Sequence, residues 1–191
     1  MAQPLPSTSQ PKAPKSSSWT APRSRRRRLP KPSWPSGGQA IAIAADVTKE
    51  DDTAAFIAKA LEAYGQLNIV VTCAGIIRDG LTISPDKETK KVTRKLGLDK
   101  WQQVIDVNLT GTFLTMRDAA EAMANGGWPG LLVGISSVNK VGQVGQINYA
   151  STKAAVALMP KILVGESCSK AFAHSRSQYC PWLCRTSLLQ G

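Results

Sequence analysis

Residues 135–158 read ISSVNKVGQVGQINYASTKAAVAL, a stretch that joins a short apolar strand to a helix through a glycine-broken loop. The strand ends in Ser136 and Ser137, and the helix carries Tyr149 and Lys153. Residues four apart in a helix lie on one face, about a turn from each other. A nearby ammonium favours the phenolate form of a tyrosine, whose ordinary pKa is about 10, and so brings the hydroxyl into a range useful for acid–base work. Either serine hydroxyl can hydrogen-bond the oxygen that receives the proton, and the sequence leaves the choice open.

A strand–helix–strand pattern lies upstream of this stretch. Apolar runs at residues 39–45 (QAIAIAA) and 67–72 (LNIVVT) predict two buried strands, and residues 131–135 predict a third. Between the first two, an apolar stripe at helical spacing predicts a helix that ends at Gly65, with Thr48 and Asp51 as its capping pair. This βαβ unit predicts an α/β protein with a parallel sheet and helices on its faces.

The rest of the chain shows weaker patterns. Residues 76–97 predict a polar loop, long enough to be functional or mobile. Residues 98–125 predict two helical segments that meet near residues 108–111, and residues 166–191 show no usable period and predict an irregular tail. The buried positions expected on the two helical segments are Trp101, Val104, Ile105, Phe113, Leu114 and Met116.

The net charge of +11 belongs mainly to the amino-terminal arm. Residues 1–38 hold eight basic side chains and no acidic one, which leaves about +3 for the remainder. Residues 1–36 are dense in Pro, Ser and Arg, and they predict disorder because they offer little apolar surface to bury. The arm resembles an organelle transit peptide, and residues 25–28 (RRRR) could contact phosphates or act as a nuclear signal. We favour the simpler interpretation, a solvated tail with no role, over the targeting and phosphate-binding interpretations.

Cysteine usage indicates a reducing compartment, so we expect a cytoplasmic protein. The four cysteines give no disulfide framework. Cys180, Cys184 and His174 are possible metal ligands by residue type, but no second pair with zinc spacing exists, so no metal site is predicted. No apolar run has the length of a membrane span, and no membrane partner is expected.

The order serine, glycine-rich loop, Asn-Tyr-Ala-Ser-Thr-Lys resembles the catalytic segment of the short-chain dehydrogenases/reductases. The resemblance implies that Tyr149 is the acid in carbonyl reduction and the base in alcohol oxidation. It implies that Lys153 lowers the pKa of that tyrosine and holds the nicotinamide ribose, while Ser137 orients the substrate oxygen. Asn108, in the run DVNLTG at residues 106–111, is implied to hold a water of the proton relay.

The same resemblance implies a cofactor site for NAD or NADP, without choosing between them. Asp46 and Val47 match the pair whose aspartate caps the adenine, and Cys73-Ala74-Gly75 resembles the Asn-Ala-Gly that lines the cofactor. With Tyr149 and Lys153, these are the expected cofactor-binding residues. The glycine-rich turn of the family and the strand that selects the nucleotide are not recognisable in residues 1–36, and the region after Gly165 shows only a faint echo of the family.

The expected fold is therefore a partial Rossmann-like, doubly wound parallel sheet in three αβα layers, truncated at both ends. Its expected parts are a disordered tail at residues 1–36, the partial domain at 37–165 and an irregular tail at 166–191. With the family's strand order 3-2-1-4-5-6-7, the strand at 39–45 is orphaned or re-pairs beside residues 67–72. Both ends could be out-of-frame translation, and we expect poor solubility or a molten state.

Three functions follow as expectations. The first is an NAD(P)-dependent oxidoreductase that acts on a small-molecule ketone or secondary alcohol, similar to 3-oxoacyl or general carbonyl reductases. The second is a non-catalytic fragment that associates through helices 102–125 and 147–163, the faces by which family members pair as homo-oligomers. The third, nucleic-acid binding through the basic arm, has only the charge in its favour.

Overall fold

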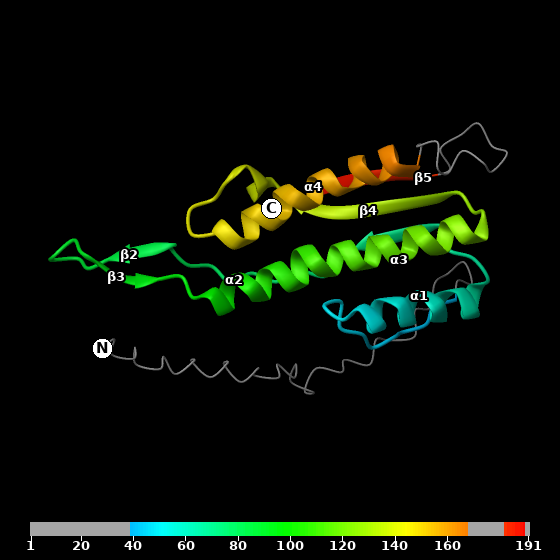
Figure 1. The fold of residues 1–191 in the computed structure, drawn as a ribbon, viewed down its shortest axis with the longest axis horizontal. Helices are drawn as coiled ribbons and strands as arrows, with labels where there is room; N and C mark the ends of the chain where they lie inside the picture. The colour runs from blue at the N-terminus through cyan, green and yellow to red at the C-terminus, as the bar shows by residue number, and fades with distance from the viewer. Residues whose placement is uncertain (1–38, 168–181, 190–191) are drawn as a thin grey trace, which may run out of the picture. The chain divides into compact units, whose positions relative to one another are not determined.

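The computed structural model of the chain describes residues 39–167 and, as backbone, residues 182–189. The chain divides into two units, Met1–Ala42 and Ile43–Gly191. Residues 39–42 of the first unit form no helix or strand. The predicted disorder of residues 1–36 lies outside the described residues. All helices and strands described below belong to the second unit (Figure 1).

Helix α1 (Glu50–Tyr64) ends where the sequence predicts, and its N-cap lies one residue later than predicted. Gly65 adopts the left-handed conformation with φ 76°, and its N–H donates to the Leu61 carbonyl at 2.8 Å. The predicted capping pair Thr48 and Asp51 is wrong, because Lys49 is the N-cap and no side chain caps the helix. Thr48 Oγ1 donates instead to Asp46 Oδ1 at 2.8 Å, within the preceding turn.

Three strands form a parallel sheet in the order β1-β4-β5. They are β1 (Ile69–Thr72), β4 (Gly130–Ser137) and β5 (Trp182–Leu189). In β1, Ile69 pairs with Leu131 of β4, and on the other edge of β4 Gly130 pairs with Trp182. The prediction of an irregular tail at residues 166–191 is therefore wrong for β5. This strand is held by backbone pairing with β4, and the periodicity of its own sequence does not reveal that pairing.

The strand predicted at residues 39–45 is wrong, because this segment has no strand conformation. A strand needs a hydrogen-bonded neighbour, and in the described sheet β1 pairs only with β4. Because no strand forms in this segment, neither expected outcome, an orphaned strand or a strand re-paired beside residues 67–72, is found in the described residues.

The crossover between β1 and β4 contains α2 (Leu98–Val104), a π-helical turn η2 (Ile105–Thr110) and α3 (Gly111–Gly126). The break predicted near residues 108–111 lies within and just after this turn. Val104, Leu114 and Met116 are buried as predicted. Phe113 is not, because its side chain is 50% exposed on the outer side of α3 and lies against Arg117.

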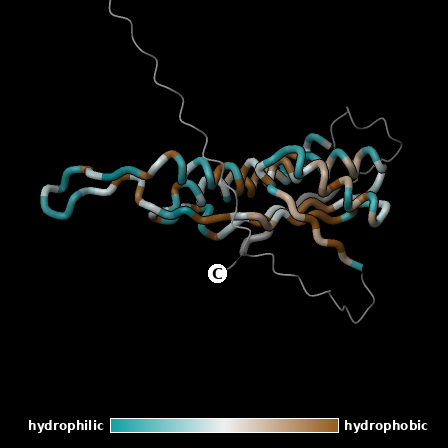
Figure 2. The backbone as a smooth tube through the Cα atoms, turned by 90° about the horizontal axis from the view of Figure 1, so that it is seen from below, coloured by the Kyte–Doolittle hydropathy of each residue, from teal (hydrophilic) through white to brown (hydrophobic). Residues whose placement is uncertain are grey.

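The polar loop predicted at residues 76–97 contains an antiparallel hairpin, β2 (Ile83–Pro85) with β3 (Val92–Lys95), so the prediction is wrong for these strands. The hairpin extends from the end of the domain where α2 begins (Figure 1). Its tip is hydrophilic, as the teal colour in Figure 2 shows. The chain after β4 continues through a 3₁₀ turn η3 (Val138–Val141) into α4 (Ile147–Ser167).

The helices pack on one face of the sheet. The buried core cluster joins Ile57 of α1 and Met123 of α3 to Leu132 of β4, and Leu163 of α4 packs against it. On the opposite face, Ile69 and Val71 of β1 are 63% and 49% exposed. Parallel sheets normally bury both faces, so within the described residues the sheet has an apolar face that no helix covers. The expected low solubility stays a prediction.

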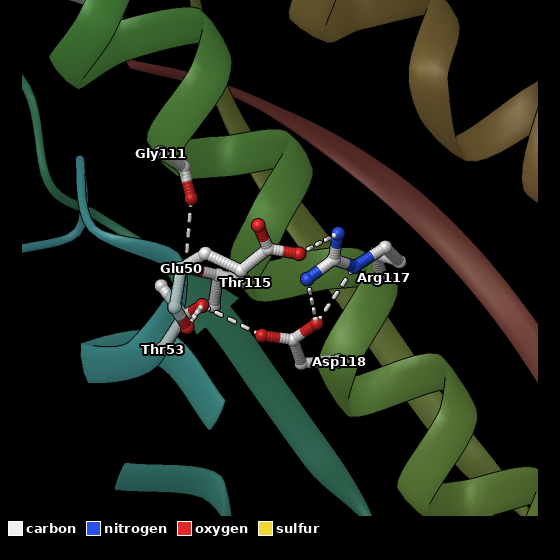
Figure 3. A network of polar contacts seen from close by, with 6 residues as sticks. All are labelled: Glu50, Thr53, Gly111, Thr115, Arg117 and Asp118. Atoms are coloured by element: carbon white, nitrogen blue, oxygen red, sulfur yellow. Dashed lines mark hydrogen bonds and ion pairs between the residues drawn. The ribbon is translucent and has the colours of Figure 1, made fainter. Parts of the chain in front are cut away.

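A polar network ties α1 to α3 (Figure 3). Asp118 is buried, accepts a hydrogen bond from Thr53 Oγ1 at 2.6 Å and pairs with Arg117 at 2.6 Å. Arg117 also pairs with the exposed Glu50 at 2.7 Å. Hydrogen bonds from Arg117 to both acids raise the pKa of the guanidinium, Asp118 being the larger cause. Because Asp118 contacts both the buried Thr53 and the more exposed Arg117, the network depends on it more than on Glu50.

We expect Asp118→Ala to lower the free energy of unfolding by about 1–3 kcal/mol, since it removes the buried, charged acceptor of the Thr53 hydroxyl, which then keeps only the Glu50 carbonyl at 2.8 Å. The matched change Glu50→Ala removes only a surface ion pair and should cost less than about 1 kcal/mol. Urea unfolding followed by circular dichroism measures both. Equal losses in the two variants would show that the buried contact adds nothing to stability.

Candidate active site

Lys153 occupies the centre of the site. Its side chain is only 6% exposed, and Nζ donates to the Ile135 carbonyl of β4 at 2.7 Å. The same nitrogen lies 5.7 Å from the centre of the Tyr149 ring. The helical spacing therefore does bring the side chains of Tyr149 and Lys153 together. The Ile135 carbonyl holds the ammonium of Lys153 in this position.

Burial lowers the pKa of Lys153 below its ordinary value, and the nearby Cys73 opposes that shift. Removing an ammonium from water disfavours its charged form. The charge that remains is poorly screened, so it acts more strongly on groups beside it than a surface lysine would. The arrangement suits an ammonium that assists a neighbouring hydroxyl.

Asn108 joins the π-helical turn to the loop that follows β1. It is fully buried, its Oδ1 accepts from the Ile76 N–H at 2.8 Å, and its Nδ2 donates to the Ile76 carbonyl at 2.9 Å. A Cβ placed on Gly75 would lie 3.5 Å from Asn108 Oδ1 and 3.8 Å from Lys153 Nζ. Asn108 and Lys153 thus face the same backbone segment, at the carboxyl end of β1.

The two serines at the end of β4 differ in what they bond. Ser136 is fully buried, and its hydroxyl donates to the Lys153 carbonyl at 2.6 Å, so its proton is committed to the helix backbone. Ser137 Oγ accepts from the Asn139 N–H at 3.2 Å, which leaves its own proton available. Of the alternatives that the sequence leaves open, the geometry favours Ser137.

Tyr149 is half-buried in the first turn of α4. Within the described residues its hydroxyl has no hydrogen-bond partner, in contrast to the buried polar groups around it. A phenol held beside an ammonium, with its oxygen uncommitted, can exchange a proton with a bound molecule.

Sequence reasoning missed Asn148. This side chain is fully buried, its Oδ1 accepts from the Tyr149 N–H at 2.8 Å, and its Nδ2 lies 3.0 Å from the Arg78 carbonyl and 3.3 Å from that of Lys100. It therefore fixes the start of α4 against the loop after β1 and the start of α2. An asparagine at the first turn of a predicted helix was the available signal.

Hydrogen bonds also tie the loop after β1 to the loop before Tyr149. Gly80 N–H donates to the Gly145 carbonyl at 2.8 Å, and Gln146 Nε2 donates to Asp79 Oδ2 at 2.9 Å. The segments that meet here expose large aliphatic side chains, which we call the apolar rim: Ile77, Leu81, Ile83, Val141, Val144 and Ile147.

Only some of the expected cofactor residues lie near Lys153. Cys73, exposed at the end of β1, is close enough to Lys153 to influence its pKa, and Gly75 adjoins Lys153 as described, with Ala74 between them in the chain. Val47 packs against η2–α3, where a Cβ on Gly111 would lie 2.7 Å from its Cγ2. The Asp46 carboxylate accepts from the Thr48 N–H and hydroxyl, and no contact joins it to the Tyr149–Lys153 group in the described residues.

Two features are absent from residues 39–167. No group of three or more His, Cys, Asp or Glu side chains is arranged there to hold a metal ion. No helix in this part is long and apolar enough to cross a membrane.

A family model described as short chain dehydrogenase matches residues 26–171, more than half of the chain. The chain belongs to this family. Its relatives include glucose 1-dehydrogenase 2 of Bacillus subtilis, 33% identical over 128 residues, which cover 66% of this chain and 46% of the relative. The 3-oxoacyl-[acyl-carrier-protein] reductase of a Synechocystis species is 33% identical over 135 residues, covering 70% of this chain and 50% of the relative.

A solved short-chain dehydrogenase/reductase, that of Mycobacterium ulcerans, superimposes with a TM-score of 0.58 at 30% sequence identity. The superposition covers 69% of this short-chain dehydrogenase chain and 44% of the solved one. The predicted α/β, Rossmann-like class and the predicted family are thereby confirmed. The chain spans half or less of the length of these relatives, so the activity of a whole family member is a proposal for this chain.

Proposed function

We propose that this chain provides the proton-transfer site of an NAD(P)-dependent oxidoreductase that interconverts a ketone and a secondary alcohol. The observation that carries the proposal is the buried Lys153 ammonium, held between the Ile135 carbonyl and the Tyr149 ring. A structural lysine of an ordinary helix would reach water, whereas this one remains buried beside a phenol with a free hydroxyl.

The proposed roles follow from the hydrogen-bonding groups that each side chain still has available. Tyr149 donates a proton to the carbonyl oxygen during reduction and removes it during oxidation, because its hydroxyl is uncommitted. Lys153 stabilises the negative charge that develops on the phenol oxygen. Ser137 donates its free proton to the substrate oxygen. Asn108 holds the loop after β1 in place through Ile76 and so keeps this group of residues together.

The residues present fit the nicotinamide end of the cofactor. Cys73, Ala74 and Gly75 are exposed at the carboxyl end of a parallel strand, where nucleotides bind in open α/β sheets. Gly75 leaves room beside Lys153, whose remaining N–H groups can bond a ribose hydroxyl. The proposed role of Asp46 and Val47 at the adenine end, and the choice between NAD and NADP, rest on the family resemblance alone. The bound nicotinamide supplies the hydride.

The apolar rim supports a substrate with an aliphatic part. Val141 and Val144 are 86% and 84% exposed in the loop that leads to Tyr149. When several exposed aliphatic side chains gather in one place, they mark a surface that binds a ligand or a partner. A 3-oxoacyl compound, like the one in the name of the Synechocystis relative, fits this surface better than a sugar. We therefore propose a 3-oxoacyl thioester as the substrate class.

A titration of the purified chain tests the proposal. Addition of NADPH or NADH should quench tryptophan fluorescence, and acetoacetyl-CoA should then cause oxidation of the bound nucleotide. Glucose as the oxidisable substrate with NAD or NADP gives the matched comparison. Binding of neither nucleotide would reject the proposal, and turnover of glucose alone would reject the acyl substrate.

A second candidate, a non-catalytic fragment that associates through its helices, is favoured by one observation. Phe113 on α3 and Leu158 and Ile162 on α4 are all at least half exposed. Association through these helix faces would bury them, as we also propose for a homo-oligomer of the active protein. Light scattering of the chain with Phe113→Ser tests association separately from turnover.

A further inference from the structure

The hairpin β2–β3 is a built element rather than a loose loop. The Asp86 carboxylate accepts hydrogen bonds from the Glu88 N–H at 3.0 Å and from the Thr89 N–H at 2.8 Å. These bonds, the one from Thr89 first, lower the pKa of Asp86. The Asp86 N–H donates to the Lys91 carbonyl at 2.8 Å, which closes the turn. The shape of the tip is therefore fixed, and the negative charge of Asp86 is used inside it.

The hairpin concentrates positive charge. Residues 39–167 contain 13 acidic and equally many basic side chains, but residues 83–95 hold five of the bases and only two of the acids. Eight bases and eleven acids remain for the other described positions. The hairpin thus carries a net charge of +3 on a body of net charge −3. The five basic residues are all exposed, and they are Lys87, Lys90, Lys91, Arg94 and Lys95.

None of these five cations is neutralised within the described part of the chain, where both ion pairs involve Arg117. A compact group of unpaired like charges attracts an oppositely charged partner and raises the rate of encounter. The hairpin therefore offers an electrostatic docking surface that the fold itself does not use.

The root of the hairpin adjoins the proposed active site. Leu96 N–H donates to the Thr82 carbonyl at 3.0 Å, which joins the two strands at their base, and Gly80 N–H donates to Gly145 four residues before Tyr149. Ile83 at the base of the hairpin belongs to the apolar rim. The surface thus begins with aliphatic side chains beside the site and continues with basic side chains along the hairpin, from Lys95, which pairs with Ile83 at the base, to Lys87 in the turn.

We infer that hairpin β2–β3 docks a small acidic carrier protein that presents the acyl substrate on a flexible thioester arm. The inference rests on the proposed function, since the apolar rim receives the acyl chain while the basic side chains along the hairpin meet the carrier. A coenzyme nucleotide is the other anionic carrier of acyl thioesters. Nucleotide sites are concave, whereas these cations stand on an exposed hairpin, so the geometry favours a protein partner.

Binding of holo-acyl carrier protein, an acidic protein, is the direct test and needs no turnover. The variant Lys87→Gln/Lys91→Gln/Lys95→Gln removes three hairpin charges, and it keeps the Asp86 carboxylate and the backbone bond to residue 91 that closes the turn. The control Lys49→Gln/Lys59→Gln/Lys161→Gln removes three exposed charges elsewhere. Fluorescence anisotropy of labelled carrier should show a Kd about tenfold higher for the hairpin variant at low salt and little change for the control. Wild-type affinity should fall as salt rises.

Other results would overturn the inference. They are no binding by the wild-type chain, equal binding by the two variants, or weakened binding of CoA with unchanged binding of the carrier. With acetoacetyl-carrier as substrate, the hairpin variant should raise KM and leave kcat unchanged, and the uncharged acetoacetyl-N-acetylcysteamine thioester should show no effect. A chain that binds the carrier through the hairpin but reduces nothing would reject the proposed function and keep the docking surface.

Discussion

Tyr149→Phe should lower kcat for acetoacetyl-CoA reduction by about 10²–10⁴-fold, the usual contribution of a positioned general acid. The change removes one oxygen, and that oxygen has no hydrogen-bond partner in the described residues. The free energy of unfolding should therefore change by less than about 0.5 kcal/mol. Steady-state rates with NADPH or NADH, together with urea unfolding, separate the two effects.

Tyr64→Phe is the matched control for this prediction. Tyr64 is the last residue of α1, is 43% exposed and lies outside the site. The same chemical change there should leave both turnover and stability unaltered. If Tyr149→Phe retained most of the wild-type kcat, the proton would have to come from another group, and the assignment of the site would fail.

The sequence predicted the parts of the site that are local in the chain. The pair Tyr149 and Lys153 follows from helical spacing, and Ser136 and Ser137 follow from the end of an apolar strand. The structure adds what spacing cannot give. The Ser136 hydroxyl bonds the Lys153 carbonyl and so leaves Ser137 as the candidate. Asn148 acts through carbonyls at residues 78 and 100, far away in the sequence.

The errors in the fold prediction share a physical cause. A strand is stable only beside another strand, so the apolar run at 39–45 is not a strand while the less regular run at β5 is. In hairpin β2–β3 the Asp86 carboxylate accepts hydrogen bonds from backbone groups inside the turn, and the spacing of Asp86 and Thr89 is the sequence signal for it. Periodicity predicts Phe113 in the core because it identifies an apolar position without showing which face the neighbouring layer covers.

Lys153→Met should lower kcat by about 10²–10³-fold, a typical loss when a group that stabilises developing charge is removed. The matched change Lys161→Met alters an exposed lysine on the same helix and should leave kcat unchanged. The two variants should also differ in how their stability depends on pH, because Lys161→Met keeps the buried Lys153, whose pKa is lowered by burial.

The sign of that pH effect follows from proton linkage. In the unfolded chain Lys153 has its ordinary pKa of 10.5, and in the folded protein burial lowers it. Between the two pKa values the unfolded state binds more protons, so wild-type stability gains a rising contribution as pH increases through that window. Below the folded pKa both states are charged, and the full cost of burying the ammonium is present.

Lys153→Met lacks this rising contribution to stability, whereas Lys161→Met keeps it. The free energy of unfolding, measured from neutral pH to about pH 10.5, should therefore rise less, or fall more, in Lys153→Met than in Lys161→Met. Parallel curves for the two variants would mean that Lys153 is as well hydrated as a surface lysine, and its role beside Tyr149 would lose its physical basis.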